Sequence, residues 1–269
     1  MPATIHNRHS KSIILYLPYA SGGASIRRII TRLTGDQYRL CETDMEAWMG
    51  NENEETYRIR PTGHIYIFFD AKRIKKAVSE SGLRLEDLRY LVCLRDPRDL
   101  LVSLYFLTQD TTHLAIAEGS PVHKQMLQAA EKAAATPIDE YVLASVDGFR
   151  SVMEELQQFL AEIPQERVTH LSYATLCHAF PFFLAKMIDV LGASPSRSTV
   201  AELLETEDIE RPKTLHRESL AHFPKASPKP GRHKRDLHPH SVRRLYQEFK
   251  QTLSWMASND LPEFRELYS

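Results

Sequence analysis

Residues 90–106 have the sequence YLVCLRDPRDLLVSLYF. The continuous apolar run at 90–94 is typical of a parallel strand that is covered on both faces. Arg95 follows this run directly, and the Asp-Pro pair after it is a common start of a helix. Apolar residues spaced i, i+1, i+4 and i+5 then predict an amphipathic helix over about 97–107. The stretch therefore predicts a buried strand that leads through a charged turn into a helix.

Two polar side chains in this stretch are candidates for holding a phosphate. Arg95 stands at the carboxyl end of the predicted strand, where open α/β sheets bind their ligands, and its planar fork of donors fits two phosphate oxygens. Ser103 follows eight residues later, beside the apolar stripe of the helix. A purely structural turn, in which Arg95 pairs with Asp99 and Ser103 faces water, explains the same pattern.

A second strand-to-helix turn occurs near the N-terminus. The apolar run at 13–17 leads into PYASGGAS, residues 18–25, and a helix is predicted over about 24–34. Small residues and paired glycines let backbone amides approach an anion, and a helix N-terminus adds further donors. The turn has neither the GxxxxGK[ST] pattern of nucleotide triphosphatases nor the GxGxxG dinucleotide pattern. A structural tight turn explains the glycine pair equally well. The candidate anion-binding residues are Ser21, Gly22, Gly23, Ala24 and Ser25.

The order of predicted elements defines the fold class. Strands over 13–17, 64–69 and 90–94 alternate with helices over about 24–34, 71–80 and 97–107, which is typical of a parallel sheet. We therefore expect an α/β three-layer sandwich, with a mainly parallel sheet flanked by helices, in a single domain over 1–269. A long amphipathic helix is predicted over 138–163 and a last one around 242–253. Residues 108–136 are predicted to be an insertion or lid, where acceptor specificity usually lies.

Composition narrows the class of protein further. The chain has 269 residues, 42% of them hydrophobic, which suffices for one sizeable core, and its net charge of −1 argues against a general nucleic-acid binder. Three scattered cysteines without a CxxC pair predict free thiols in a reducing compartment. No apolar run reaches the roughly 20 residues that span a bilayer, so we expect no membrane span and a cytoplasmic location. The His-Pro-His sequence at 238–240 lacks further ligands, and no metal site is predicted.

The two anion sites together resemble those of the sulfotransferases that use 3′-phosphoadenosine 5′-phosphosulfate (PAPS). The first motif of that family is commonly PKxGT or PKTGGTS, and ASGGAS at 20–25 is similar to it. The second motif is an Arg at a strand end with a Ser eight residues later. The resemblance implies a P-loop-like fold, PAPS as donor and the bisphosphate PAP as product. It also implies that Arg95 and Ser103 hold the 3′-phosphate.

Two later segments extend the resemblance. Residues 167–176, followed by FFLAKMIDVLG, resemble the strand-plus-YEDL segment of the family, which implies that Tyr173 reaches the adenine. Residues 229–239 resemble the mobile basic loop KxGxWKxxFTP, so the resemblance implies a mobile loop over about 225–240. Gly231, Arg232 and Lys234 would close over the 3′-phosphate. His233 stands where the family has Trp.

The general base is predicted from a Gly-His pair. Some branches of the family carry this pair, and there the His takes the proton of the acceptor hydroxyl. The resemblance implies that role for His64, since histidine is the side chain most often used as a general base in enzymes. The chain has twelve histidines, and a structural role at a strand start is the alternative.

One departure from the family affects the catalytic charge. The first motif normally supplies a Lys that stabilises the leaving phosphate, and Ala20 stands in its place. Arg27 or Arg28 could supply the charge, a basic residue of the C-terminal loop could do so, the chain could bind the nucleotide without turnover, or the aligned register could be off by one.

The sequence thus predicts an enzyme that transfers a sulfuryl group from PAPS to a hydroxyl acceptor. The acceptor could be a sugar, a lipid, a phenol, a carrier-bound alcohol or a peptide tyrosine. The main alternative is a non-catalytic nucleotide-binding protein that retains the fold. A nucleotide kinase is a weaker alternative, because its phosphate-loop Lys is missing.

Overall fold

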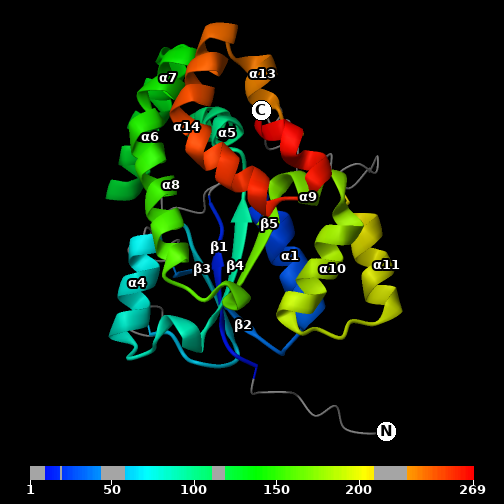
Figure 1. Ribbon diagram of the computed structural model, residues 1–269. Coiled ribbons are helices and arrows are strands. Elements are labelled where there is room, and N and C mark those ends of the chain that lie inside the picture. The colour runs from blue at the N-terminus through cyan, green and yellow to red at the C-terminus, as the bar shows by residue number, and fades with distance from the viewer. Residues whose placement is uncertain (1–9, 19, 44–57, 111–118, 209–228) are drawn as a thin grey trace, which may run out of the picture.

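The computed structural model describes residues 10–18, 20–43, 58–110, 119–208 and 229–269, and its centre is a five-stranded sheet (Figure 1). The strand order is β2-β3-β1-β4-β5, and the four neighbouring pairs are all parallel. The strands are β1 (Ile13–Tyr16), β2 (Arg39–Cys41), β3 (His64–Phe68), β4 (Arg89–Leu94) and β5 (Val168–Ser172). Because the strands run in one direction, their carboxyl ends meet at a single edge of the sheet.

Helices cover both faces of this sheet (Figure 1). The helices are α1 (Gly23–Thr34), α4 (Ala71–Glu80), α5 (Pro97–Gln109), α6 (Pro121–Ala135), α7 (Ile138–Ala144), α8 (Val146–Ala161), α9 (Tyr173–His178), α10 (Phe180–Leu191), α11 (Arg197–Thr206), α13 (Arg232–Asp236) and α14 (Pro239–Asn259), with 3-10 turns η1 (Leu85–Asp87), η2 (Gln165–Arg167) and η3 (Pro262–Tyr268). Alternate side chains of β1, β3 and β4 pack on α4, α5, α7, α8 and α14, and the others pack on α1, α9, α10 and α11. The strands are therefore apolar on both faces, and the predicted three-layer α/β sandwich is confirmed.

Two local predictions differ from the structure. The single helix expected over 138–163 is wrong, because α7 ends and α8 begins at Ser145. The Ser145 hydroxyl donates to the carbonyl of Tyr141 at 2.9 Å, a back-bond that competes with the regular ladder of a helix. Strand β2 was not predicted, because three residues at a sheet edge are too short to show a periodic pattern.

The region predicted to be a lid is described only in part. Helix α6 occupies residues 121–135, while 111–118 lie outside the described residues. Tyr105 of α5 donates to the carbonyl of Thr136 at 3.0 Å, which ties the end of α6 to α5. The assignment of 108–136 as an acceptor lid stays a prediction. The expectation that the whole chain forms one domain also stays a prediction.

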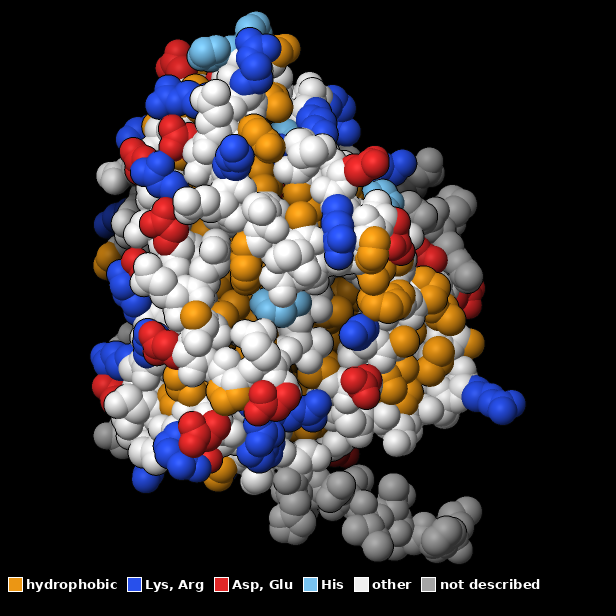
Figure 2. All heavy atoms as spheres, in the orientation of Figure 1, with side chains coloured by type: hydrophobic (Ala, Val, Ile, Leu, Met, Phe, Trp, Pro, Cys, Tyr) orange, Lys and Arg blue, Asp and Glu red, His pale blue; other side chains and the backbone are white. Residues whose placement is uncertain are grey.

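The surface shows no dominant charge on the face drawn in Figure 2, where acidic and basic side chains are interspersed and hydrophobic ones gather over α10 and α11. No helix within the described ranges is long and apolar enough to cross a lipid bilayer. The same ranges contain no group of three or more His, Cys, Asp or Glu side chains placed to hold a metal ion.

Candidate functional site

Arg95 lies at the carboxyl end of β4, as predicted from its position behind the apolar run. Its side chain is buried, one guanidinium nitrogen donates to the carbonyl of Ala20, and the guanidinium carbon is 4.3 Å from the centre of the Tyr173 ring. Its Nε and Nη2 atoms have no hydrogen-bond partner among the described residues. The buried Oγ of Ser103 likewise has none within that part of the chain. Buried donors normally have a partner, so this pair of residues is suited to an anionic ligand.

The turn after β1 lies directly against this arginine. Gly22 precedes α1 in the left-handed conformation, at φ 81°, and the Ser21 side chain is buried with no hydrogen-bond partner for its Oγ among the described residues. Ser25 instead faces outward, and its Oγ accepts from Arg28 at 3.1 Å. The structure therefore brings Ser21 and Gly22 to Arg95, together with the N-terminus of α1, whose first amides lack intrahelical partners.

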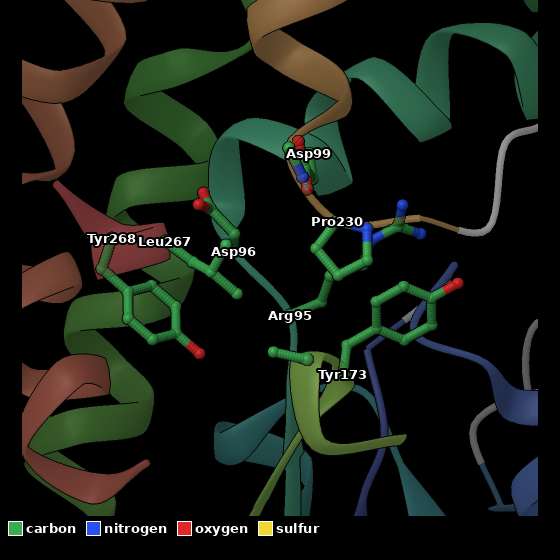
Figure 3. A pocket seen from close by; sticks show the side chains of 9 residues that line it. Arg95, Asp96, Asp99, Tyr173, Pro230, Leu267 and Tyr268 are labelled. Carbon is green, nitrogen blue, oxygen red and sulfur yellow. Dashed lines mark hydrogen bonds between the residues drawn. The ribbon is translucent and has the colours of Figure 1, made fainter. Parts of the chain in front are cut away.

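Tyr173 joins these two elements. It begins α9 directly after β5, and its buried ring lies beside the Arg95 guanidinium in Figure 3. A Cβ atom on Gly22 would lie 3.2 Å from Cε2 of Tyr173 and 2.8 Å from Cδ2 of Leu176, so this turn needs a glycine both for its conformation and for its close packing. Burial raises the pKa of the Tyr173 hydroxyl above its ordinary value, so the phenol stays protonated near neutral pH.

The basic segment near the C-terminus packs on α5 next to the same arginine. Residues 232–236, expected within a mobile loop, form helix α13, while 225–228 lie outside the described residues. Arg232 is buried, and its guanidinium carbon is 4.1 Å from the centre of the Phe106 ring. Lys234 is exposed to solvent. The structure therefore brings Gly231 to the pocket and leaves Lys234 at the surface. Arg232 lies against Phe106, three residues beyond Ser103 on α5, and its Nε donates to Asp236 at 2.5 Å.

A buried carboxylate anchors this segment. Asp99 accepts hydrogen bonds from the backbone N–H of Gly231 at 2.6 Å, from the backbone N–H of His233 at 2.9 Å and from the ring Nδ1 of His233 at 2.6 Å. The structural alternative predicted a pair between Arg95 and Asp99. The structure instead shows Arg95 donating to the carbonyl of Ala20, while Asp99 accepts from Gly231 and His233. Asp99 was missed as a site residue, although its spacing of four from Ser103 places both on one face of α5.

A small pocket opens among these elements (Figure 3). Arg95, Tyr173, Pro230 and Gly231 line it, together with the carboxylates of Asp96 and Asp99. Leu267 and Tyr268 lie on the side opposite Tyr173. Tyr268 donates to Asp260 at 2.5 Å and ties the end of the chain to α14. The pocket thus combines one arginine, an aromatic ring, two carboxylates and the turn at Pro230 and Gly231.

The two arginines near the start of α1 differ in position. The Arg27 guanidinium lies over the turn, because a Cβ atom on Gly23 would be 2.6 Å from its Nη1. Its Nη2 donates to Oε2 of Glu42 at 2.7 Å. Arg28 points to Glu207, with 2.7 Å between Nε and Oε1. Arg27 is therefore the better placed of the two to replace the charge that Ala20 lacks.

His64 lies away from this site, which corrects its prediction as general base. It begins β3, and its ring Nδ1 is 2.8 Å from the carbonyl of Thr62. The registers pair Phe68 with Tyr16 and Tyr16 with Val92, so His64 and Arg95 are seven residues apart along the strand direction, roughly 20 Å. The Gly-His pair stands at the start of the strand, whereas anion sites form where parallel strands end.

The carboxyl end of β3 carries a different polar residue. Asp70 follows the strand and starts α4, where its carboxylate accepts from the backbone N–H of Lys72 at 2.7 Å. Because β3 is the neighbour of β1 in the sheet, Asp70 shares the edge that carries the turn at 20–25. The apolar run that precedes Asp70 was the signal that could have pointed to it.

This geometry defines a class of α/β protein in which two strand-to-helix turns meet at the carboxyl edge of a parallel sheet, an arrangement suited to an anionic ligand. The sulfotransferase domain family matches residues 73–254, more than half of the chain. The protein therefore belongs to the sulfotransferase domain family. The matched range includes Arg95, Ser103 and Tyr173 and ends beyond the basic segment, and it begins after the turn at 20–25.

Solved structures show the same fold at low sequence identity. A mouse sulfotransferase, SULT7A1, solved with PAP, superposes with a TM-score of 0.53 at 15% identity, over 91% of this chain and 83% of the mouse chain. Retinol dehydratase, solved with retinol and PAP, superposes with a TM-score of 0.50 at 14% identity, over 93% of this chain and 83% of the other. No curated protein matches the sequence.

Proposed function

We propose that this protein transfers a sulfuryl group from PAPS to a hydroxyl acceptor and releases PAP. The observation that carries the proposal is the buried Arg95 guanidinium at the end of β4, with two nitrogens that lack partners among the described residues, together with Ser103 in the same state. A phosphate group would supply acceptors for both residues at once. Family membership and structures of relatives that were solved with PAP support this assignment.

The order of strands suggests how the nucleotide lies. Arg95 and Ser103 would hold the 3′-phosphate, with Gly231 and Arg232 on its other side, and Tyr173 would contact the adenine. The turn after β1 is the next position along the sheet edge, so its amides at 21–25 would face the 5′-phosphosulfate. The acceptor would then approach over β3 and β2, on the far side of that turn.

The same order suggests roles for two charged residues. In the reaction the acceptor oxygen attacks sulfur, the bond between sulfur and the bridging phosphate oxygen breaks, and the hydroxyl proton passes to a base. We assign the base to Asp70, at the end of the strand next to the turn. Arg27 would offset the charge that develops on the leaving phosphate, with Glu42 fixing its orientation.

The charge role of Arg27 can be tested without a known acceptor. Replacing Arg27 by Gln should weaken binding of adenosine 3′,5′-bisphosphate about tenfold or more, the size of one charge-assisted hydrogen bond, and leave adenosine 3′-monophosphate unaffected. Arg28→Gln is the matched control, because Arg28 faces Glu207, and it should bind both nucleotides normally. Equal effects of the two substitutions would remove Arg27 from this role.

The second candidate function is nucleotide binding without turnover. It is favoured by Ala20, which supplies no charge, and by the pairing of Arg27 with Glu42. Once an acceptor is found, Asp70→Asn separates the two functions, because Asn is an equally good helix cap and only the base is lost. Sulfotransfer predicts that this variant keeps bisphosphate affinity and loses turnover.

Calorimetric titration tests the proposed donor directly. We expect adenosine 3′,5′-bisphosphate to bind in the micromolar range or tighter, without a metal ion, and ATP with magnesium to bind much more weakly. Binding of ATP with magnesium in preference to the bisphosphate would overturn the assignment and favour a kinase.

A further inference from the structure

The Asp99 carboxylate makes contacts that the proposed function does not yet use. It is buried, with 1% of its surface exposed, and it accepts three hydrogen bonds from residues more than 130 positions away in the sequence. Two of these bonds come from the backbone, at Gly231 and His233, so the carboxylate fixes the path of the main chain and not only one side chain. Asp99 thus joins α5 to the start of α13.

The hydrogen bonds also determine which of the two side chains, Asp99 or His233, carries the shared proton. Burial alone would raise the pKa of the Asp99 carboxyl, but the hydrogen bonds from His233 and the nearby charge of Arg95 hold this pKa below its ordinary value. Asp99 is therefore ionised near neutral pH and can only accept, so the Nδ1 atom of His233 must carry the proton that it shares with the carboxylate. His233 is itself fully buried.

The anchored segment lies on the face of α5 that carries Ser103, the residue proposed above to bind the phosphate. Asp99, Ser103 and Phe106 follow one another at spacings of four and three, which places them on one side of the helix. Asp99 holds Gly231 and His233, while the Phe106 ring packs against the guanidinium of Arg232. The segment is thus attached both before and after the turn of helix that carries Ser103.

We propose that Asp99 is a positioning residue that holds residues 231–233 against α5, so that this segment forms the wall of the 3′-phosphate site opposite Arg95. This inference rests on the proposed function for the identity of the ligand. The hydrogen bonds from Gly231 and His233 to Asp99 do not depend on that identity.

The test uses one variant of the anchor and one matched control. Asp99→Asn keeps the size of the side chain but removes the charge and replaces one acceptor with a donor, which would face an N–H group. Asp139→Asn is the control, because Asp139 also accepts from a backbone N–H of this region, that of His238 at 3.0 Å, but at an exposed position. Both proteins are titrated with adenosine 3′-monophosphate and adenosine 5′-monophosphate, and amide hydrogen exchange is followed over residues 229–237.

In Asp99→Asn we expect exchange over 229–237 to accelerate at least tenfold and affinity for the 3′-monophosphate to fall at least tenfold, with affinity for the 5′-monophosphate changed less than twofold. The Asp139→Asn control should match the wild type in its exchange rates and in its affinities for both monophosphates. His233→Phe, which keeps both backbone bonds and a buried ring, should give a smaller loss and serves as the test if Asp99→Asn does not fold.

Each failure has its own signature. Unchanged exchange and unchanged 3′-monophosphate affinity in Asp99→Asn would overturn the positioning role. An equal loss for both monophosphates would also overturn it, because the effect would then be a general structural one. If the wild type binds neither nucleotide, the proposed function fails, while the exchange measurement still decides whether Asp99 anchors the segment.

Discussion

The turn at 20–25 contains Gly22, which is in the left-handed conformation and packs closely against α9. Comparing Gly22 with a second left-handed glycine separates the free energy of this packing from that of the backbone conformation. Gly22 has φ 81° and Gly82, at the end of α4, has φ 66°. An alanine at either position must adopt a conformation that costs L-residues about 1–2 kcal/mol. No heavy atom lies within 4 Å of a Cβ placed on Gly82, so Gly82→Ala should lose only this backbone contribution.

Gly22→Ala should cost more, because the new methyl group meets side chains of α9. Its Cβ would lie 2.8 Å from Cδ2 of Leu176 and 3.2 Å from Cε2 of Tyr173, and both of those side chains are buried. Overpacking of this kind typically costs about 1–3 kcal/mol. We therefore expect Gly22→Ala to lose about 2–5 kcal/mol of unfolding free energy in total.

The assay is urea denaturation of the wild type and of both variants, with the free energy extrapolated to water. Calorimetry should also show weaker bisphosphate binding in Gly22→Ala, because relief of the clash moves Tyr173, and unchanged binding in Gly82→Ala. Equal losses of stability in the two variants would refute the reasoning that the turn is closely packed against α9.

Two further substitutions test how titratable and charged side chains inside the protein affect its stability. Burial lowers the pKa of His170 to about 4, so the unfolded chain binds the extra proton between pH 6.5 and pH 4 and stability falls on acidification through this window. His170→Phe should remove about 2–3 kcal/mol of the loss between pH 7 and pH 4.5, as followed by urea denaturation at the two pH values; an unaltered pH dependence would count against it. Arg98 is buried and donates to Asp96 at 2.8 Å and to the carbonyl of Leu267 at 2.9 Å. Arg98→Ala should cost about 3–5 kcal/mol in the same assay, and a loss below about 1 kcal/mol would show that the pair contributes little.

The sequence predicted those features that depend on neighbouring residues. Strand β4, the helix start behind it and the position of Arg95 follow from an apolar run and an Asp-Pro pair, so local pattern sufficed. His64 was correctly predicted to begin a strand, but its role as base came from the resemblance alone, and the start of a parallel strand is not the edge where ligands bind. The contact between Asp99 and His233 could not be predicted, since 134 positions separate them and only the fold brings them together.

Strand β2 and the break between α7 and α8 were also not predictable from local sequence patterns. Three residues of β2 carry no periodic signal, and the back-bond of Ser145 depends on a geometry that apolar spacing does not record. The identity of the site came from the resemblance of several motifs, whereas its arrangement, with Arg27 rather than Arg28 over the turn, came from the structure.

The central claim is that Arg95 and Ser103 bind the 3′-phosphate of an adenine nucleotide. The most direct measurement is calorimetric binding of adenosine 3′,5′-bisphosphate and adenosine 5′-monophosphate to the wild type and to Arg95→Gln. We predict that the wild type prefers the bisphosphate and that Arg95→Gln loses this preference, with its affinity for the 5′-monophosphate retained. A variant that still prefers the bisphosphate as strongly as the wild type would contradict the account.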